Sequence, residues 1–434
     1  MSVNSNLIVN KSKALFGKIM IPGDKSISHR SIILGSITEG ELTIKNFLYS
    51  DDCLKTISAM KQLGANIMVY NKTISISGKG LDGLCKPNNI IDAGNSGTLI
   101  RLLTGVLSTQ NFTSSLTGDE SLRSRPMDRI IKPLGNCGAK IISDNSKAPL
   151  TINPNSELSS IDYVQEIASA QIKSCLMLAA LFIKGKHSFY EKITTRDHTE
   201  NLLEHFGCDI ERTNNRIVMS GRQKLIANDI EISSDISSAA FFIVAALISE
   251  ESDIVIPNVN INPYRIGIIT ALKQMKANIN LKNLRVISNE RVADIEIKSS
   301  KLVSININGD IISTLIDELP ILFIACAVAD GTSIISGIEE LRYKESNRIE
   351  AMEEGLKAIG INVSSSYDSI QITGGEIIGG KVDSYDDHRI AMSFAVAGII
   401  SQKSVTICNT KNISTSFPTF VDLLRQQGVN VFEI

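Results

Sequence analysis

The sequence predicts an α/β protein of two domains, each built from three similar units. One pattern recurs about every 70 residues along the chain. Each unit contains an apolar helix, a short strand and an amphipathic helix, usually followed by one or two further strands. The chain has 434 residues, which is too long for one ordinary core and favours two domains.

The six units are recognised by polar residues before the first helix and a turn residue after the second. Asp and Ser before an apolar run are typical helix N-caps, and Gly after an amphipathic run is a typical left-handed C-cap. The first helices are expected to begin at Asp24-Lys25-Ser26, Asn95–Thr98, Ser169–Gln171, Asp235–Ser238, Asp317–Pro320 and Asp387–Arg389. The second helices are expected to end near Gly64, Gly138, Gly207, Asn278, Gly360 and Gly428.

The apolar stretch Leu7–Ile21 has no unit of its own, and the sixth unit stops at Ile434 with almost no closing strand. We therefore expect the N-terminal strand to cross over and complete the last sheet. This pairing gives one domain at residues 22–233. The other domain is discontinuous and comprises residues 1–21 and 234–434.

Composition excludes several classes of partner. The net charge is −2, so no global field attracts nucleic acid or a membrane surface. The longest apolar runs, near 175–183, 239–248 and 321–329, are about half a membrane span and suit buried helices. The N-terminus lacks a signal-peptide core, and the seven cysteines are scattered without a C-x-x-C pair. We expect a cytoplasmic protein without disulfides, zinc, nucleic acid or membrane partners.

Charged or polar residues gather at the starts of the first helices of five units. They are Lys25, Asn95, Ser169 with Gln171, Asp317, and His388 with Arg389. A helix start attracts anions through its free N–H groups and its dipole. Because equivalent helices should point the same way, we expect these groups to converge on one surface of each domain.

The stretch Arg342–Met352 opens an amphipathic helix with an apolar stripe at Ile349, Met352, Leu356 and Ile359. If that helix begins at Lys344, Glu345 lies on the inward line between the cations Lys344 and Arg348. A carboxylate held among cations suits proton transfer. The alternative is a solvated charge cluster at a helix start.

Two motifs in the first half suit anion binding. In Asp24–Arg30, Lys25 and Arg30 supply charge, and Ser26 supplies a hydroxyl and a helix cap. In Asp92–Arg101, glycines including Gly97 let a ligand approach the backbone, although the loop is not a Walker A motif. The alternatives are a capped surface helix and a tight turn.

Further candidates are arginines in loops before helices and carboxylates before buried helices. Arg123, Arg125 and Arg196 fit planar anions, and their alternative is surface ion pairing. Asp317 precedes a buried helix, where it acts either as a cap or as a desolvated base. The run Asp386–Arg389 has metal-ligand residue types, but consecutive residues rarely share one ion, so we expect no metal.

With these residues in place, the chain resembles the enolpyruvyl transferase family, most closely the branch that acts on shikimate 3-phosphate. The resemblance spans nearly the whole chain. It rests on seven ordered motifs: Pro22–Arg30, Gly94–Thr98, Arg123–Pro126, Ser169–Gln171, Asp317, Lys344–Arg348 and Asp387–Arg389. It implies a two-domain inside-out α/β barrel with three βαβαββ-type units per domain and an active site in the interdomain cleft.

The resemblance also implies the chemistry. The enolpyruvyl group of phosphoenolpyruvate would move to the 5-hydroxyl of shikimate 3-phosphate by addition and elimination of phosphate, without metal or organic cofactor. Separately from the resemblance, we expect a monomer. It implies that Asp317, Glu345 and Lys25 are catalytic. Shikimate 3-phosphate would be held by Lys25, Ser26, Arg30, Ser169, Gln171, Arg196, Asp317 and Lys344. Phosphoenolpyruvate would be held by Lys25, Gly97, Arg125, Gln171, Arg348 and Arg389.

Two positions depart from the pattern of some family members. Ala170 replaces a serine, and Thr415 replaces a lysine that contacts phosphoenolpyruvate. Gly97 keeps the small residue whose enlargement blocks glyphosate in resistant relatives, so we expect glyphosate to compete with phosphoenolpyruvate. Two rival functions are enolpyruvyl transfer to UDP-N-acetylglucosamine, disfavoured because Asp119–Arg125 has no Cys, and anion binding without catalysis, disfavoured by two retained carboxylates.

Overall fold

The computed structural model describes residues 5–434. Over these residues the chain is α/β, as predicted, and forms six four-stranded sheets. It divides into two compact bodies. The N-terminal body consists of Gly23–Ser233 and Val286–Glu290. The C-terminal body consists of the chain up to Pro22, Ser234–Arg285 and Arg291–Ile434.

The N-terminal body contains the first three units. Its helices are α1 (Lys25–Ser36), α2 (Asp51–Gln62), α3 (Gly97–Leu107), α4 (Glu120–Ser124), α5 (Asp128–Asn136), α6 (Ala170–Ala180) and α7 (His198–His205). Its strands are β3 (Glu39–Lys45), β4 (Asn66–Tyr70), β5 (Thr73–Lys79), β6 (Ile91–Asp92), β7 (Ser114–Thr117), β8 (Lys140–Asp144), β9 (Lys147–Asn153), β10 (Asp162–Val164), β11 (Lys186–Tyr190), β12 (Ile210–Thr213), β13 (Arg216–Ser220) and β14 (Ile230–Glu231).

The three sheets of this body share one topology. Their strand orders are β14-β3-β5-β4, β6-β7-β9-β8 and β10-β11-β13-β12. In each sheet a short edge strand pairs in parallel with the strand after a first helix, and the other pairings are antiparallel. The edge strand of the first sheet is β14, from the end of the third unit, with Ile230 opposite Ile44.

The C-terminal body contains the last three units. Its helices are α8 (Ile236–Ile248), α9 (Gly267–Gln274), α10 (Ile311–Leu315), α11 (Leu319–Ala327), η1 (Glu339–Tyr343), α12 (Arg348–Ala358), α13 (His388–Gly398), η2 (Thr410–Thr415) and α14 (Phe420–Gln426). Its sheets are β16-β17-β15-β2, β18-β19-β21-β20 and β22-β23-β1-β24. The strands are β1 (Leu7–Val9), β2 (Phe16–Lys18), β15 (Asp253–Asn260), β16 (Asn278–Ile287), β17 (Glu290–Lys298), β18 (Asn306–Ile307), β19 (Thr332–Ser336), β20 (Asn362–Ser365), β21 (Ser369–Thr373), β22 (Gly380–Asp383), β23 (Val405–Cys408) and β24 (Val431–Glu433).

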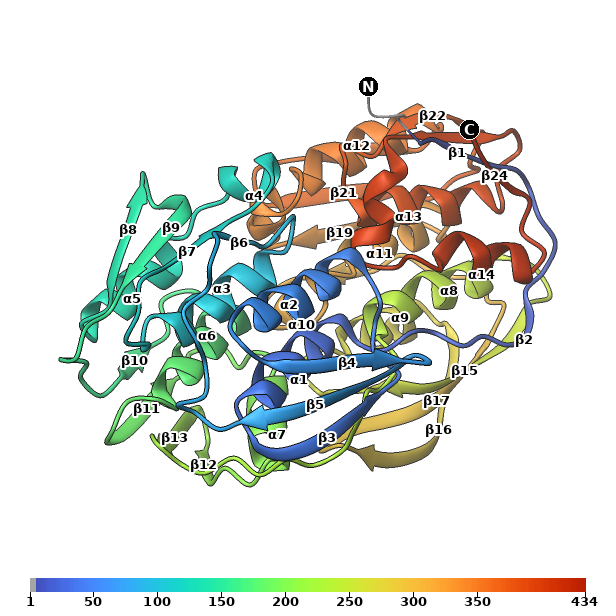
Figure 1. Cartoon of the computed structure of the whole chain (residues 1–434). Coiled ribbons are helices and arrows are strands. Elements are labelled where there is room, and N and C mark those ends of the chain that lie inside the picture. The colour runs from blue at the N-terminus through green and yellow to red at the C-terminus, as the bar shows by residue number, and fades with distance from the viewer. Residues whose placement is uncertain (1–4) are drawn as a thin grey trace. The chain divides into compact units, whose positions relative to one another are not determined.

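The N-terminal crossover is present, but the expectation of one strand over Leu7–Ile21 was wrong. β1 lies between β23 and β24, antiparallel to both, and so completes the last sheet. Figure 1 shows β1 beside β24. The polar run from Asn10 to Lys13 then leaves the ladder, and the Ser12 N–H bonds the carbonyl of Ile399 instead. β2 joins the fourth unit's sheet, parallel to β15. The N-terminal segment therefore serves two sheets.

Each body has its own apolar core around the first helices of its units. In the C-terminal body α8, α11 and α13 are buried along almost their whole length and pack against one another. In the N-terminal body α3 packs against α1 and α6. No core residue is shared between the two clusters of buried side chains in the described chain. This packing brings together the starts of the first helices within each body.

Candidate functional site

The starts of α1, α3 and α6 lie together in the N-terminal body, as the repeat predicts. The Ser96 hydroxyl, which caps α3, lies 3.5 Å from Nε2 of His29 on α1. The Gln171 amide at the start of α6 donates to the Thr98 hydroxyl on α3 at 3.0 Å. Polar groups from three units therefore share one end of the buried helices.

Lys25 begins α1 and is only partly buried. Its Nζ lies 2.6 Å from the Asp52 carboxylate, and 18% of the side chain is exposed. The expectation that Ser26 caps the helix was wrong, because Asp24 accepts the Ile27 N–H at 2.9 Å instead. An Asp is an equally good cap, and the sequence places it one position before Lys25. The Ser26 hydroxyl therefore has no capping role.

Arg30 lies one turn further along α1 and is almost completely buried. Its Nε donates to the Thr199 hydroxyl at 2.7 Å, and its Nη2 donates to the Ser174 hydroxyl at 2.7 Å. Its Nη1 donates to the carbonyl of Ser26 at 3.0 Å. These bonds hold a cation beside the starts of three elements, α1, α6 and α7.

Gly97 and Arg125 are close neighbours. A Cβ on Gly97 would lie 3.2 Å from Nη1 of Arg125 and 3.3 Å from Nη1 of Arg101. Arg125 follows α4 and donates to Asn95 at 2.8 Å, and Arg101 donates to the Gln171 carbonyl oxygen. The expected loop before Arg125 is thus a short helix, which Asp119 caps. Arg125 is buried and Arg123 is exposed.

Ser169 and Arg196 lie at the starts of helices in the third unit. Ser169 is the N-cap of α6, but its hydroxyl makes no capping bond. Arg196 lies in the irregular segment between β11 and α7 and is half-buried. A buried Lys173 on α6 anchors that segment through the Thr195 carbonyl at 3.4 Å.

In the C-terminal body the starts of α8, α11 and α13 also converge. Glu318, the N-cap residue of α11, accepts from the Ser237 hydroxyl on α8. Arg389 on α13 donates to the carbonyl of Asp317 at 2.7 Å. Asp317 does not cap the helix, because the N-cap position belongs to Glu318, which itself makes no capping bond. The reading of Asp317 as a helix cap is therefore excluded.

The segment Lys344–Asn347 is a loop between η1 and α12, so the expectation of a helix from Lys344 was wrong. The helix begins at Arg348, and the predicted stripe of Ile349, Met352, Leu356 and Ile359 is confirmed as buried. Lys344 Nζ lies 3.6 Å from the Asp317 carboxylate. In this loop Glu345 accepts a hydrogen bond from Arg348, and the Ser346 hydroxyl donates to Asp387. These tertiary contacts override the local helix propensity.

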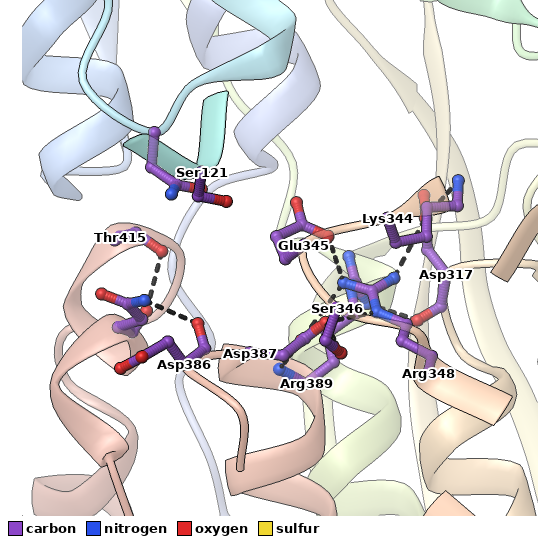
Figure 2. A network of polar contacts seen from close by, with 12 residues as sticks. Ser121, Asp317, Lys344, Glu345, Ser346, Arg348, Asp386, Asp387, Arg389 and Thr415 are labelled. Carbon is purple, nitrogen blue, oxygen red and sulfur yellow. Dashed lines mark hydrogen bonds and ion pairs between the residues drawn. The ribbon is translucent and has the colours of Figure 1, made fainter. Parts of the chain in front are cut away.

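Arg348 is the centre of this second cluster, and only 1% of its side chain is exposed, which excludes a solvated charge cluster. It donates to the Glu345 carboxylate at 2.6 Å and to the Asp387 carboxylate at 2.8 Å. Its Nη1 lies 3.9 Å from Asp317. Figure 2 shows these side chains joined by dashed lines. One buried cation thus orders three carboxylates.

Burial and charge oppose each other in the pair of Arg348 and Asp387. Burial favours the neutral form of each group, but the Asp387 and Glu345 carboxylates raise the pKa of the Arg348 guanidinium above its usual value. Burial likewise raises the pKa of Asp387, but the Arg348 cation more than offsets this and lowers that pKa overall. Both groups are therefore charged.

Asp387 also caps α13 and so orders His388 and Arg389. Its Oδ1 accepts the Arg389 N–H at 2.8 Å. His388 is buried, and Arg389 is half-buried. Thr415 occupies the position of the family lysine. Its hydroxyl donates to the Asn412 carbonyl at 2.7 Å.

Several contacts in these clusters were not identified from the sequence, although Asn95 was expected among the converging polar groups and Asp387 at a helix start. The residues that make these contacts are Asp52, Asn95, Arg101, Glu318 and Asp387. The place of Asp387 before an apolar run marks it as an N-cap, as expected, but does not reveal its bonds to Arg348. The contacts of the other four residues have no local signal, because their partners lie 27 to 81 residues away in the chain.

Other features of the described chain add no candidate site residues. A hollow of about 620 Å³ between α5, β10 and α6 is lined by none of the site residues expected from the sequence. In residues 5–434 no helix combines the length and apolarity needed to cross a bilayer. Within the same range no three His, Cys, Asp or Glu side chains are grouped as metal ligands.

Comparisons with known proteins agree on one family. The family model for EPSP synthase (3-phosphoshikimate 1-carboxyvinyltransferase) matches residues 9–424. A 3-phosphoshikimate 1-carboxyvinyltransferase of Ruthia magnifica is 47% identical over 429 residues, 98% of this chain and 99% of that protein. One from Coxiella burnetii (strain CbuK_Q154) is 47% identical over 422 residues, 97% and 96% of the two chains.

Solved structures give the same result. The structure of EPSP synthase from Acinetobacter baumannii has a TM-score of 0.90 and 43% sequence identity to this chain, and the match covers 100% of both chains. The match extends through both bodies and therefore includes both polar clusters. The chain belongs to the EPSP synthase (3-phosphoshikimate 1-carboxyvinyltransferase) family.

Proposed function

We propose that this protein moves the enolpyruvyl group of phosphoenolpyruvate to the 5-hydroxyl of shikimate 3-phosphate, releasing phosphate. The observation that carries the proposal is the whole-length match to relatives that bear the name of this activity. The reaction belongs to the shikimate pathway of aromatic amino acid synthesis. The family's inside-out barrels, with an active site where the two bodies face each other, are part of the same proposal.

The N-terminal body would hold shikimate 3-phosphate. Its proposed groups are Lys25, Ser26, Arg30, Ser169, Gln171 and Arg196, joined by Asp317 and Lys344 from the C-terminal body. The bonds that anchor Arg30 and Gln171 support this role, because they keep both side chains in place without substrate. Preorganised donors bind an anion without first losing side-chain entropy.

Phosphoenolpyruvate would be held by Lys25, Gly97, Arg125, Gln171, Arg348 and Arg389. Arginine suits this ligand because its planar fork matches carboxylate and phosphate oxygens. Arg125 and Arg348 are both nearly buried, so their charges are poorly screened by solvent. Thr415 offers no charge at the position of the family lysine, so the three arginines would carry more of the binding.

Proton transfers would fall to Asp317, Glu345 and Lys25. The substrate hydroxyl attacks C2 of phosphoenolpyruvate and gives its proton to Asp317, while Glu345 or Lys25 protonates C3. The tetrahedral intermediate then loses phosphate as C3 gives that proton back. The positions of Asp317 and Glu345 support these roles. Their carboxylates lie 3.9 and 2.6 Å from the Arg348 guanidinium, which holds both of them in place.

The test is phosphate release by purified protein with each acceptor. With phosphoenolpyruvate, shikimate 3-phosphate should support turnover and UDP-N-acetylglucosamine should not. Release with the sugar nucleotide alone would move the chain to the rival branch. Binding of both anions without release of phosphate would identify a non-catalytic anion-binding protein.

We further propose a monomer that acts in the cytoplasm without a cofactor. Free thiols support a reducing compartment, and five of the seven cysteines are buried, namely Cys53, Cys137, Cys175, Cys208 and Cys326. Light scattering of the purified protein tests the monomer, since a dimer would double the 47.2 kDa mass of the chain. Activity retained after dialysis against a chelator tests the absence of a metal.

A further inference from the structure

The segment that carries Arg196 is held on its N-terminal side by buried charges. Lys173 on α6 is 2% exposed and lies 3.0 Å from Glu191 and 2.7 Å from Glu200. The Glu191 carboxylate accepts the Thr195 N–H at 3.1 Å, and Lys173 donates to the Thr195 carbonyl at 3.4 Å. The residue before Arg196 is therefore fixed through its backbone.

A second network holds the C-terminal side of the segment. Asp197 accepts from Arg212 at 3.1 Å and from Asn201 at 3.2 Å. His198, the next residue, places Nδ1 at 2.7 Å from the Glu290 carboxylate, and Asn201 donates to the same carboxylate at 3.1 Å. A carboxylate only accepts, so His198 Nδ1 carries the hydrogen.

Glu290 is remote in sequence from everything that it supports. It is the first residue of β17, directly after the two-residue turn from β16, and the hairpin tip Val286–Glu290 belongs to the N-terminal body although both strands belong mainly to the C-terminal one. Glutamate side chains are almost never fully buried unless they are paired, and Glu290 is 2% exposed beside His198, which is 1% exposed. Burying a carboxylate costs desolvation free energy, and hydrogen-bond partners must offset that cost.

We propose that Glu290 is a positioning residue for the Arg196 segment, acting through His198 and Asn201. The inference rests on the proposed function, in which Arg196 holds shikimate 3-phosphate. Arg196 is then fixed from both sides, by Lys173 through Thr195 and by Glu290 through the start of α7. Removing Glu290 frees one side of the segment and leaves a buried imidazole N–H without its acceptor.

The effect should be specific for one substrate. Glu290→Gln keeps an acceptor for Asn201 but weakens the bond to His198, and Glu290→Ala removes both bonds. We expect KM for shikimate 3-phosphate to rise about threefold in the first variant and about tenfold or more in the second. KM for phosphoenolpyruvate and kcat should stay within about twofold of wild type. The residues assigned to phosphoenolpyruvate binding and to proton transfer lie outside the Arg196 segment.

The experiment compares both variants with wild type and with Glu296→Ala, a matched control on the same strand β17 where Glu296 is half-buried. Phosphate release gives the kinetic constants, and calorimetry measures shikimate 3-phosphate binding directly. Adding His198→Gln to Glu290→Gln should raise KM by less than the product of the single effects, because the two residues share one bond.

The outcomes separate the inference from the proposed function. Wild type without phosphate release contradicts the function, and the calorimetric comparison still tests Glu290. Shikimate 3-phosphate affinity within twofold of the control in both variants overturns the inference. The inference is also overturned if kcat falls and both KM values rise to the same extent together with a fall in Tm. That pattern marks general destabilisation.

Discussion

Replacing Gly97 by Ala adds one methyl group between two cations. Gly97 is the first residue of α3, and its backbone suits any residue. The added Cβ would lie 3.2 Å from Arg125 Nη1 and 3.3 Å from Arg101 Nη1, where ordinary contacts are about 3.5–4.0 Å. Both guanidinium groups must therefore move by a few tenths of an ångström.

The displacement should cost affinity and leave stability intact. Overpacking costs about 1 kcal/mol at its low end, which applies because the contacted atoms end flexible side chains. That energy corresponds to about fivefold in KM for phosphoenolpyruvate, because Arg125 is assigned to this substrate. Ala is a better helix former than Gly by up to about 1 kcal/mol, so Tm should not fall.

The assay is phosphate release at saturating shikimate 3-phosphate with phosphoenolpyruvate varied. The matched control is Gly135→Ala, because a Cβ there meets nothing within 4 Å. We also expect glyphosate to compete with phosphoenolpyruvate in wild type and to inhibit Gly97→Ala less. An unchanged KM in Gly97→Ala with lowered Tm would refute the steric reasoning, and absence of competition at millimolar glyphosate would refute the shared site.

Three further predictions concern the C-terminal cluster. Asp317→Ala and Glu345→Gln should each lower kcat by about 10²–10⁴-fold, far more than they weaken substrate affinity, and full turnover in both would contradict their assigned roles. Asp387→Asn should destabilise the fold by about 3–5 kcal/mol at pH 7, measured by urea unfolding, because it breaks a buried pair. The pKa of Asp387 is lowered in the folded state, so its stabilisation is present above about pH 4 and is lost as pH falls further. The difference in free energy of unfolding between wild type and Asp387→Asn should therefore narrow below pH 4. A difference that stays constant with pH would count against the ion pair of Asp387 with Arg348. Arg342 donates to two carbonyls of the β20–β21 turn at 2.7 and 2.9 Å, just before the Lys344–Asn347 loop, so Arg342→Ala should lower kcat about tenfold relative to the surface control Arg425→Ala.

The repeat and the helix starts could be predicted because their signals are local. Asp235 and Asp387 precede long apolar runs, and both accept the backbone N–H groups expected of caps. The stripe from Ile349 to Ile359 sets the buried face of α12 without knowledge of the neighbouring helices. These elements depend on a few adjacent residues, so one sequence suffices.

Features that depend on distant partners could not be predicted in the same way. The Lys344–Asn347 loop is non-helical because Ser346 and Glu345 are drawn to partners that include Asp387, 41 residues beyond Ser346. β14 pairs with β3 across 186 residues, and a two-residue strand has no periodicity to read. Glu290 directly follows an ordinary polar turn in the sequence, and only the fold reveals its burial.

The path of the N-terminal segment determines when each body can be completed during synthesis. Residues 23–233 are contiguous, so nearly all of the N-terminal body is available once the ribosome has passed that region. The other body must wait, because β1 needs β23 on one side and β24 on the other, and β24 ends one residue before the last. β1 is therefore made long before its neighbours β23 and β24, and until they are made its exposed edges are open to wrong pairing with other chains.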